Sequence, residues 1–131
     1  MEKPFTILIS DRNRNVRKFL KRELMAEGYQ VQLARSGREV LEWAYDHESI
    51  DLVILDLDLP GTSELAVLEK LGDRIPALPV VVHSFLLDYA AQPALSNAAA
   101  LVEKEGNSVE RLKDIVAEIL KESDSKRSDI K

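Results

Sequence analysis

Two carboxylates, a hydroxyl and an ammonium stand at the ends of four apolar segments in this 131-residue sequence. Asp11 and Asp56 are the carboxylates, Ser84 is the hydroxyl and Lys104 is the ammonium. If the segments are parallel strands, their carboxyl ends meet at the sheet edge where open α/β folds bind ligands. A carboxylate can attack phosphorus while a cation and a hydroxyl stabilise the phosphoryl oxygens. The pattern therefore predicts a centre that forms an acyl phosphate, whose added charge could act as a switch.

Five segments are candidates for the strands that position these groups. Three are continuous apolar runs, which is typical of strands buried on both faces of a parallel sheet. The other two have a weaker pattern. In chain order, the predicted strands are Phe5–Ser10, Gln30–Ala34, Asp51–Asp56, Pro79–Ser84 and Ala99–Glu103.

Helical spacing of apolar residues separates these strands. Stripes occur over residues 16–24, 40–45, 65–71 and 109–120, and the last helix has Asn107 or Ser108 as its expected N-cap. Gly28 is expected to end the first helix. A fourth helix is expected over Asp88–Asn97, although Pro93 interrupts that segment.

The order of elements is thus β-α repeated five times, which predicts a doubly wound α/β domain with helices on both faces of the sheet. We expect this domain to span residues 1–121. Residues 122–131 are polar with mixed charge, and we expect them to form a flexible tail.

Composition excludes several classes of function. The formal net charge is -5, which argues against a broad nucleic-acid surface. Cysteine is absent, which excludes disulfides and thiolate chemistry. No apolar run approaches the roughly 20 residues that span a bilayer, and the start does not match a signal peptide. We therefore expect a cytoplasmic protein with no membrane partner.

The stretch DLVILDLDLPG, residues 51–61, resembles the strand, phosphorylatable aspartate and Pro-Gly loop of the receiver domains of two-component response regulators. The segments ILISDRNRNVRKFL, PVVVHS and LVEK extend the resemblance in the same order, over roughly residues 5–121. It implies a flavodoxin-like fold, with the strands in the order 2-1-3-4-5 across the sheet.

The resemblance also implies roles for the candidate residues. Asp56 would be the phosphoacceptor and Asp11 the retained member of an acidic pair. Ser84 would be the switch hydroxyl, and Lys104 would contact the phosphate. Mg²⁺, if bound, would be held by Asp11, Asp56 and the backbone of Asp58. The implied function is a phosphorelay module, not an enzyme, with a histidine kinase or phosphotransfer protein and a downstream target as partners.

Two residues depart from the family pattern at the centre itself. Arg12 replaces the second acid of the pair, which ordinarily coordinates Mg²⁺, and a guanidinium has no lone pair to offer. This substitution casts doubt on Mg²⁺ binding, and we expect Arg12 to reach toward Asp56 and partly replace the ion's charge. Phe85 replaces a small residue after the switch serine, so its ring could crowd the acceptor.

Two further departures concern signal transmission. Leu101 stands where the family has an aromatic switch, and Glu105 stands where a proline usually follows the lysine. With Leu101 and Glu105 at these positions, the sequence does not support signal transmission by a rotating aromatic ring. It also does not support a cis X-Pro peptide bond in the loop after Lys104.

Structural readings of the same residues remain open. Asp11 could cap the first helix, Arg12 could point into solvent, and His47 and His83 lack any metal-ligand spacing. The leading functional hypothesis is a phosphorelay receiver, and the alternative is a phosphate-independent pseudo-receiver that binds partners. A flavin or nucleotide site is a weaker hypothesis, because residues 10–15 lack the glycines of a phosphate loop. The oligomeric state is left open.

Overall fold

The computed structural model describes residues 4–46, 49–58, 64–86 and 92–129 of the chain. Five parallel strands form one sheet in the order β2-β1-β3-β4-β5. Both the doubly wound α/β architecture and the strand order 2-1-3-4-5 are therefore confirmed. The strands are β1 (Thr6–Ser10), β2 (Gln30–Ala34), β3 (Leu52–Leu55), β4 (Val80–Ser84) and β5 (Ala100–Glu103).

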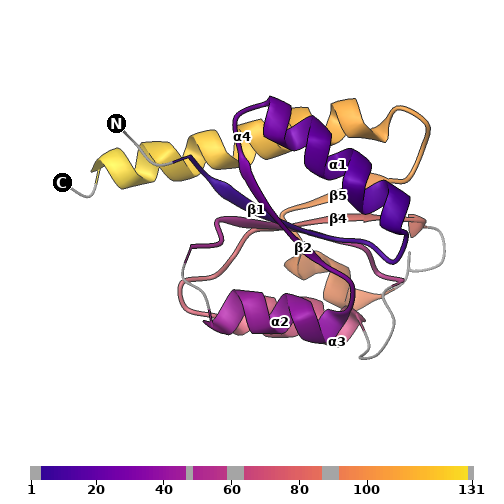
Figure 1. Cartoon of the computed structure of the whole chain (residues 1–131). Helices are drawn as coiled ribbons and strands as arrows, with labels where there is room; N and C mark the ends of the chain where they lie inside the picture. Colours follow the sequence, from indigo (N-terminus) through magenta and orange to yellow (C-terminus); the bar gives the residue numbers. More distant parts are fainter. Residues whose placement is uncertain (1–3, 47–48, 59–63, 87–91, 130–131) are drawn as a thin grey trace.

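Helices cover both faces of the sheet (Figure 1). One layer holds α1 (Arg14–Ala26) and α4 (Ser108–Asp129), and the other holds α2 (Gly37–Asp46) and α3 (Glu64–Asp73). Every residue of β1, β3 and β4 is buried, which explains why these strands read as continuous apolar runs. The edge strand β2 alternates between exposed and partly buried positions before it ends at the buried Ala34.

Two hydrophobic clusters hold the three layers together. Against one face of the sheet, Leu20 and Leu24 of α1 pack together with Leu112 and Val116 of α4. Against the other face pack Val40 and Ala44 of α2 together with Val67, Leu68 and Leu71 of α3. The periodic apolar residues of the sequence are thus the ones that join each helix to the sheet.

Helix α1 has clear signals at both ends. The side chain of Asn13 accepts hydrogen bonds from the backbone N–H groups of Asn15 and Val16, which satisfies donors that the first turn leaves free. At the other end Gly28 has a φ of 99°, a left-handed conformation that glycine adopts without steric cost. The prediction that Gly28 ends this helix is confirmed.

The prediction of a fourth α-helix over Asp88–Asn97 is wrong for the residues that can be tested. Residues 92–97 hold only the short 3-10 helix η2 (Pro93–Asn97), and residues 87–91 lie outside the described part. Pro93 stands in the first turn of η2, where its missing N–H costs nothing. The same proline would remove a hydrogen bond in the middle of a longer helix.

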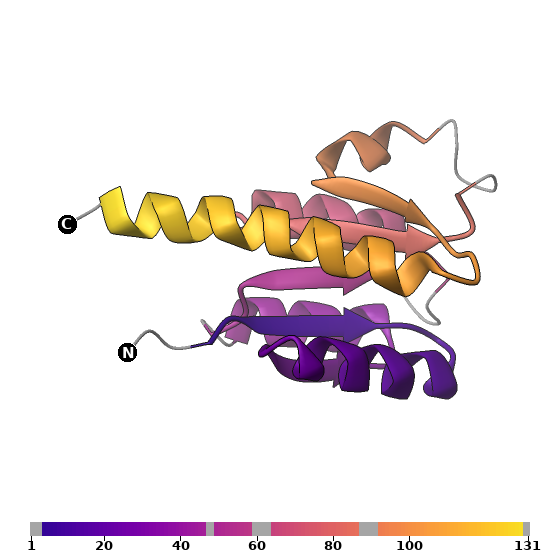
Figure 2. The ribbon, with the colours of Figure 1, turned by 90° about the horizontal axis from the view of Figure 1, so that it is seen from above.

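Helix α4 continues to Asp129, beyond residue 121 where we expect the domain to end. Its far end extends past the rest of the domain, on the same side of the molecule as the N-terminal end of β1 (Figure 2). The flexibility of residues 122–131 stays a prediction. Within the described residues, no helix combines the length and the apolar character needed to cross a membrane.

Candidate functional site

The four predicted residues meet at the carboxyl ends of the strands. Asp56 directly follows β3 and is 1% exposed, and Asp11 directly follows β1 and is fully buried. Ser84 is the last residue of β4 and is also buried. Lys104 follows β5, and its side chain is 16% exposed. The expected convergence of two carboxylates, a hydroxyl and an ammonium at one edge is therefore observed.

Among the described residues, four donors contact the Asp56 carboxylate. Its Oδ1 accepts from the Ser84 hydroxyl at 3.3 Å and from the backbone N–H of Asp58 at 3.0 Å. Its Oδ2 accepts from Lys104 Nζ at 3.2 Å and from the backbone N–H of Arg12 at 3.3 Å. These donors stabilise the negative charge of the carboxylate at the end of β3. If Asp56 carried a phosphoryl group, the same donors would lie near the phosphoryl oxygens.

Lys104 also links Asp56 to Asp11. Its Nζ lies 2.9 Å from Asp11 Oδ2, so one ammonium faces two buried carboxylates. Burial raises the pKa of Asp11, and the nearby charge of Asp56 adds to this, although the Asn13 N–H and Lys104 oppose it. Burial alone would lower the pKa of Lys104, but its hydrogen bond to Asp11 and the charges of both carboxylates outweigh burial and raise it. The lysine therefore remains charged at neutral pH.

Asp11 is not the cap of α1, since Asn13 fills that position. Instead Asp11 Oδ1 accepts the Asn13 N–H at 2.8 Å, which shapes the turn between β1 and α1. The backbone carbonyl of Asp11 accepts a hydrogen bond from Arg17 Nη1 at 2.6 Å. Arg17 was not predicted as a site residue, because nothing in its spacing indicates a backbone contact.

A second residue missed by sequence reasoning is Ser10. Its buried hydroxyl donates to the carbonyl of Ile54 at 2.9 Å and accepts the N–H of Asp56 at 3.4 Å. It thereby ties the end of β1 to the end of β3 and fixes the backbone of Asp56. A small hydroxyl at the end of an otherwise apolar strand is the one signal that could have identified it.

Arg12 does not behave as expected from the sequence. Its side chain is exposed, and within the described residues no hydrogen bond or ion pair joins its guanidinium to Asp56. Only its backbone N–H reaches the carboxylate. The residue replaces the second acid of the pair, but Lys104, not Arg12, supplies the positive charge beside Asp56.

The Phe85 ring lies toward Lys104. It is 54% exposed, and Lys104 Nζ is 5.6 Å from its centroid, within the range of a cation–π contact. Phe85 and Lys104 both line a cavity of about 400 Å³ between α1 and the start of α4. The ring therefore lies beside the lysine at the rim of the centre and remains largely in solvent.

His83 is 4% exposed, and its contact is with another side chain of the fold, which agrees with the structural role that we expect from the sequence. Its Nε2 lies 2.9 Å from the hydroxyl of Ser108, the first residue of α4. Burial lowers the pKa of His83 to about 4, and the charge of Lys104 contributes to this lowering. His47, the other histidine, lies outside the described residues.

The acidic groups of the centre fit a divalent ion only in part. Mg²⁺ usually takes one or two carboxylates from a protein, and Asp11 and Asp56 supply two. Asp11 Oδ2 is buried and the Lys104 ammonium lies 2.9 Å from it, so an ion bound there would share this oxygen with the lysine. However, the described residues contain no cluster of three acidic or histidine ligands, and Lys104 already faces both carboxylates. The residues therefore fit a weakly held ion whose remaining ligands are water or phosphate.

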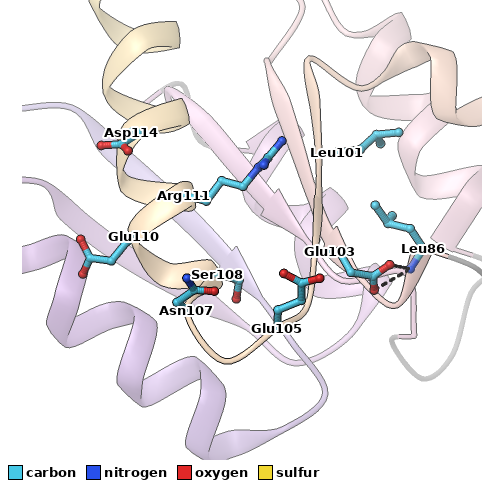
Figure 3. A pocket seen from close by; sticks show the side chains of 9 residues that line it. All are labelled: Leu86, Leu101, Glu103, Glu105, Asn107, Ser108, Glu110, Arg111 and Asp114. Atoms are coloured by element: carbon cyan, nitrogen blue, oxygen red, sulfur yellow. Dashed lines mark hydrogen bonds between the residues drawn. The ribbon is translucent and has the colours of Figure 1, made fainter.

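A separate cavity of about 540 Å³ lies beside β5 and the start of α4 (Figure 3). Here both carboxylate oxygens of Glu103 accept the backbone N–H of Leu86, at 3.2 and 3.1 Å. This contact joins the end of β5 to Leu86, in the segment that follows β4. Leu101, in the place of the family's aromatic switch, also lines this cavity and is 39% exposed.

The chain matches a family model described as "Response regulator receiver domain" over residues 7–117. It is 38% identical over 109 residues to Response regulator MprA of Mycolicibacterium vanbaalenii, covering 76% of this chain and 47% of that protein. It is 31% identical over 113 residues to the DNA-binding transcriptional regulator NtrC of Escherichia coli, covering 75% of this chain and 24% of that protein. The chain thus spans about half or less of the curated relatives it matches.

Solved structures show the same likeness. The response regulator TrrA of Thermotoga maritima, solved with Mg²⁺ and BeF, superposes with a TM-score of 0.80 at 31% identity, covering 87% of this chain and 97% of that one. TrrA in complex with the histidine kinase ThkA superposes with a TM-score of 0.79, covering 88% and 98%. The match of sequence and fold places this chain in the response-regulator receiver domain family.

Proposed function

We propose that this chain is a phosphorelay receiver, which takes a phosphoryl group onto Asp56 from a histidine kinase or phosphotransfer protein. A carboxylate oxygen of Asp56 forms a bond to phosphorus as the bond between phosphorus and the donor's imidazole nitrogen breaks. The imidazole leaves with the electron pair of that bond and takes up a proton. Asp56 is then an acyl phosphate.

The observation that carries this proposal is the set of donors around Asp56. Lys104 Nζ at 3.2 Å and the Ser84 hydroxyl at 3.3 Å approach different oxygens of the same buried carboxylate. After transfer, the ammonium can pair with phosphoryl oxygens and the hydroxyl can donate to them. The side chains of Lys104 and Ser84 then shift toward the phosphoryl oxygens. This shift can bias the loops after β4 and β5 toward a state that binds a downstream partner.

The comparisons support the choice of donor and cation. TrrA forms a complex with a histidine kinase, and it was solved with Mg²⁺ and BeF. In this chain Asp11, Asp56 and the backbone carbonyl of Asp58 would hold Mg²⁺, which would offset negative charge on the phosphoryl oxygens. Because Arg12 takes the place of an acid, we expect weaker Mg²⁺ binding than a complete acidic pair provides.

The proposal is tested by incubating the protein with acetyl phosphate and Mg²⁺ and measuring its intact mass. We expect one added phosphate, which Asp56→Asn abolishes. Asp73→Asn is a matched control, because Asp73 is the exposed last residue of α3 and does not belong to the donor set around Asp56. Absence of an adduct with acetyl phosphate and with a cognate kinase would overturn the proposal.

The alternative is a pseudo-receiver that binds partners without phosphate. Arg12 favours it, since loss of one acid weakens the metal site. In that case the mass spectrum shows no adduct, while the protein still binds its partner with Asp56→Asn in place. The intact donor set of Asp56, Ser84 and Lys104 favours the phosphorelay.

A further inference from the structure

Basic residues are concentrated at the start of α1. Residues 12–22 contain six arginines or lysines and no acid, although the whole chain has a net charge of -5. The first turn of α1 also contains no acidic residue. Since the N-terminal end of a helix dipole favours negative charge, this distribution is unfavourable for the isolated domain. The rest of the protein is correspondingly acidic.

These cations form a defined basic surface rather than a dispersed one. Arg14, Arg17 and Lys18 of α1 line a cavity of about 260 Å³ together with Arg35, which follows β2. We call these four residues the basic surface. The one acid that lines this cavity is Glu39, whose carboxylate already accepts the Arg35 N–H at 3.2 Å and pairs with Arg35 Nε at 3.5 Å.

The basic surface is short of partners within the domain. In the part of the chain that the structure describes, Arg14 and Lys18 make no ion pair, and they lie four residues apart on one helix face, where like charges repel. Cations elsewhere do find acids. Arg38 Nε lies 3.1 Å from Glu42, and Lys113 Nζ lies 2.9 Å from Glu23. Of the four cations of the basic surface, Arg35 alone forms an ion pair within the described residues.

The basic surface also adjoins the acceptor centre. Arg17 donates to the backbone carbonyl of Asp11 at 2.6 Å, and the neighbouring Arg12 N–H reaches Asp56. A molecule bound to the basic surface would thus contact residues that hold the β1–α1 turn in place. Binding there would occur beside the centre without filling it.

We infer that the basic surface docks an acidic segment of a partner protein. Guanidinium groups bind carboxylates in a planar, two-bonded geometry, and three of the four cations are arginines. A long polyanion such as a nucleic acid would also meet the acidic remainder of the domain, which repels it. A short acidic segment senses mainly the local charge, because salt screens charges beyond about 8–10 Å. This inference concerns a surface outside the acceptor centre and does not depend on phosphorylation.

The test is an NMR titration of the ¹⁵N-labelled protein with a synthetic oligo-glutamate peptide. We expect salt-dependent binding, with the largest amide shifts at Arg14, Lys18 and Arg35. Arg14→Glu combined with Lys18→Glu should weaken binding about tenfold or more. The control, Lys70→Glu combined with Arg111→Glu, makes the same change in net charge at exposed residues of other helices and should leave binding within about twofold.

Three results of the peptide titration would overturn the inference: no binding by the wild type, equal loss in both double variants, or shifts that map elsewhere. Duplex DNA and vesicles of anionic phospholipid form two further arms of the experiment. If either binds the basic surface more tightly than the peptide does, the partner is not an acidic protein segment. Phosphate uptake from acetyl phosphate is measured in parallel. We expect it to be unchanged in the Arg14→Glu, Lys18→Glu variant, which separates failure of docking from failure of the acceptor.

Discussion

Lys104 Nζ lies 3.2 Å from Asp56 Oδ2 and 2.9 Å from Asp11 Oδ2, so a single ammonium forms ion pairs with two buried carboxylates. Repulsion between Asp11 and Asp56 contributes to the raised pKa of Asp11. The centre is thus held together by a cation that phosphorylation would also recruit. This dual role makes Lys104 a test of both stability and function.

We predict that Lys104→Met lowers the free energy of unfolding by roughly 2–4 kcal/mol, because it leaves two buried carboxylates without their cation. Urea denaturation at pH 7.5 measures the change. Adding Asp11→Asn to the Lys104→Met variant removes one of the repelling charges and should recover at least half of the loss. A loss below about 0.5 kcal/mol in the single variant would show that the two ion pairs do not stabilise the fold.

Ser10 provides a second prediction. Ser10→Ala leaves the Ile54 carbonyl and the Asp56 N–H without their buried partner, so we expect a loss of about 1–3 kcal/mol in the free energy of unfolding. Ser96→Ala is the matched control, because the Ser96 hydroxyl donates an exposed hydrogen bond to the Pro93 carbonyl. Equal effects of the two substitutions would contradict the bridging role of Ser10.

His83 makes stability depend on pH in a specific direction. Its pKa is about 4 in the folded state, whereas an exposed histidine has a pKa of 6.5. The unfolded chain therefore takes up a proton as the pH falls below 6.5, while the folded chain resists until about pH 4. The associated stability is complete above pH 6.5 and is lost between pH 6.5 and 4, on the order of 2–3 kcal/mol.

The comparison that isolates this effect is the wild type against His83→Gln. The stability difference between the two proteins should change by that amount from pH 7.5 to pH 4, because the glutamine does not titrate. Other carboxylates titrate in both proteins and cancel in the difference. If the difference in the free energy of unfolding between the two proteins does not change with pH, the pKa of His83 is not lowered in the folded state.

The charge distribution of α1 gives a fourth prediction. Arg14→Glu places an acid in the first turn, where the helix dipole favours it, and should raise the free energy of unfolding by about 0.3–1 kcal/mol at low salt. Thermal unfolding measures the gain, which added salt should reduce. Lys21→Glu, located well inside α1, makes the same charge change and should stabilise less. A larger gain from Lys21→Glu would show that general charge balance, and not the dipole, is responsible.

The site could be predicted from sequence to the extent that it depends on where strands end. Asp11, Asp56, Ser84 and Lys104 each end or follow an apolar run, and parallel strands place such positions at one edge. The contacts made through backbone groups could not be predicted. The Arg12 N–H meets Asp56 across 44 residues of sequence, and which atoms meet depends on strand register, which local patterns do not specify.

Two other expectations failed for identifiable reasons. We expected the Arg12 guanidinium to reach Asp56, but Lys104 fills that role and leaves the arginine in solvent. The helix expected over Asp88–Asn97 is replaced in its described part by η2, because Pro93 suits a first turn and not a helix interior. Both errors arose where a tertiary contact or a single residue overrides a pattern.

The central claim is that Asp56, and not its neighbour Asp58, receives the phosphoryl group. The most direct measurement is to treat the protein with acetyl phosphate and Mg²⁺, reduce it with borohydride, and sequence the peptide by mass spectrometry. Borohydride converts an acyl phosphate of aspartate to homoserine, which marks the modified position. We predict homoserine at position 56 alone. Homoserine at position 58, or no conversion under conditions that label a known receiver, would contradict the account.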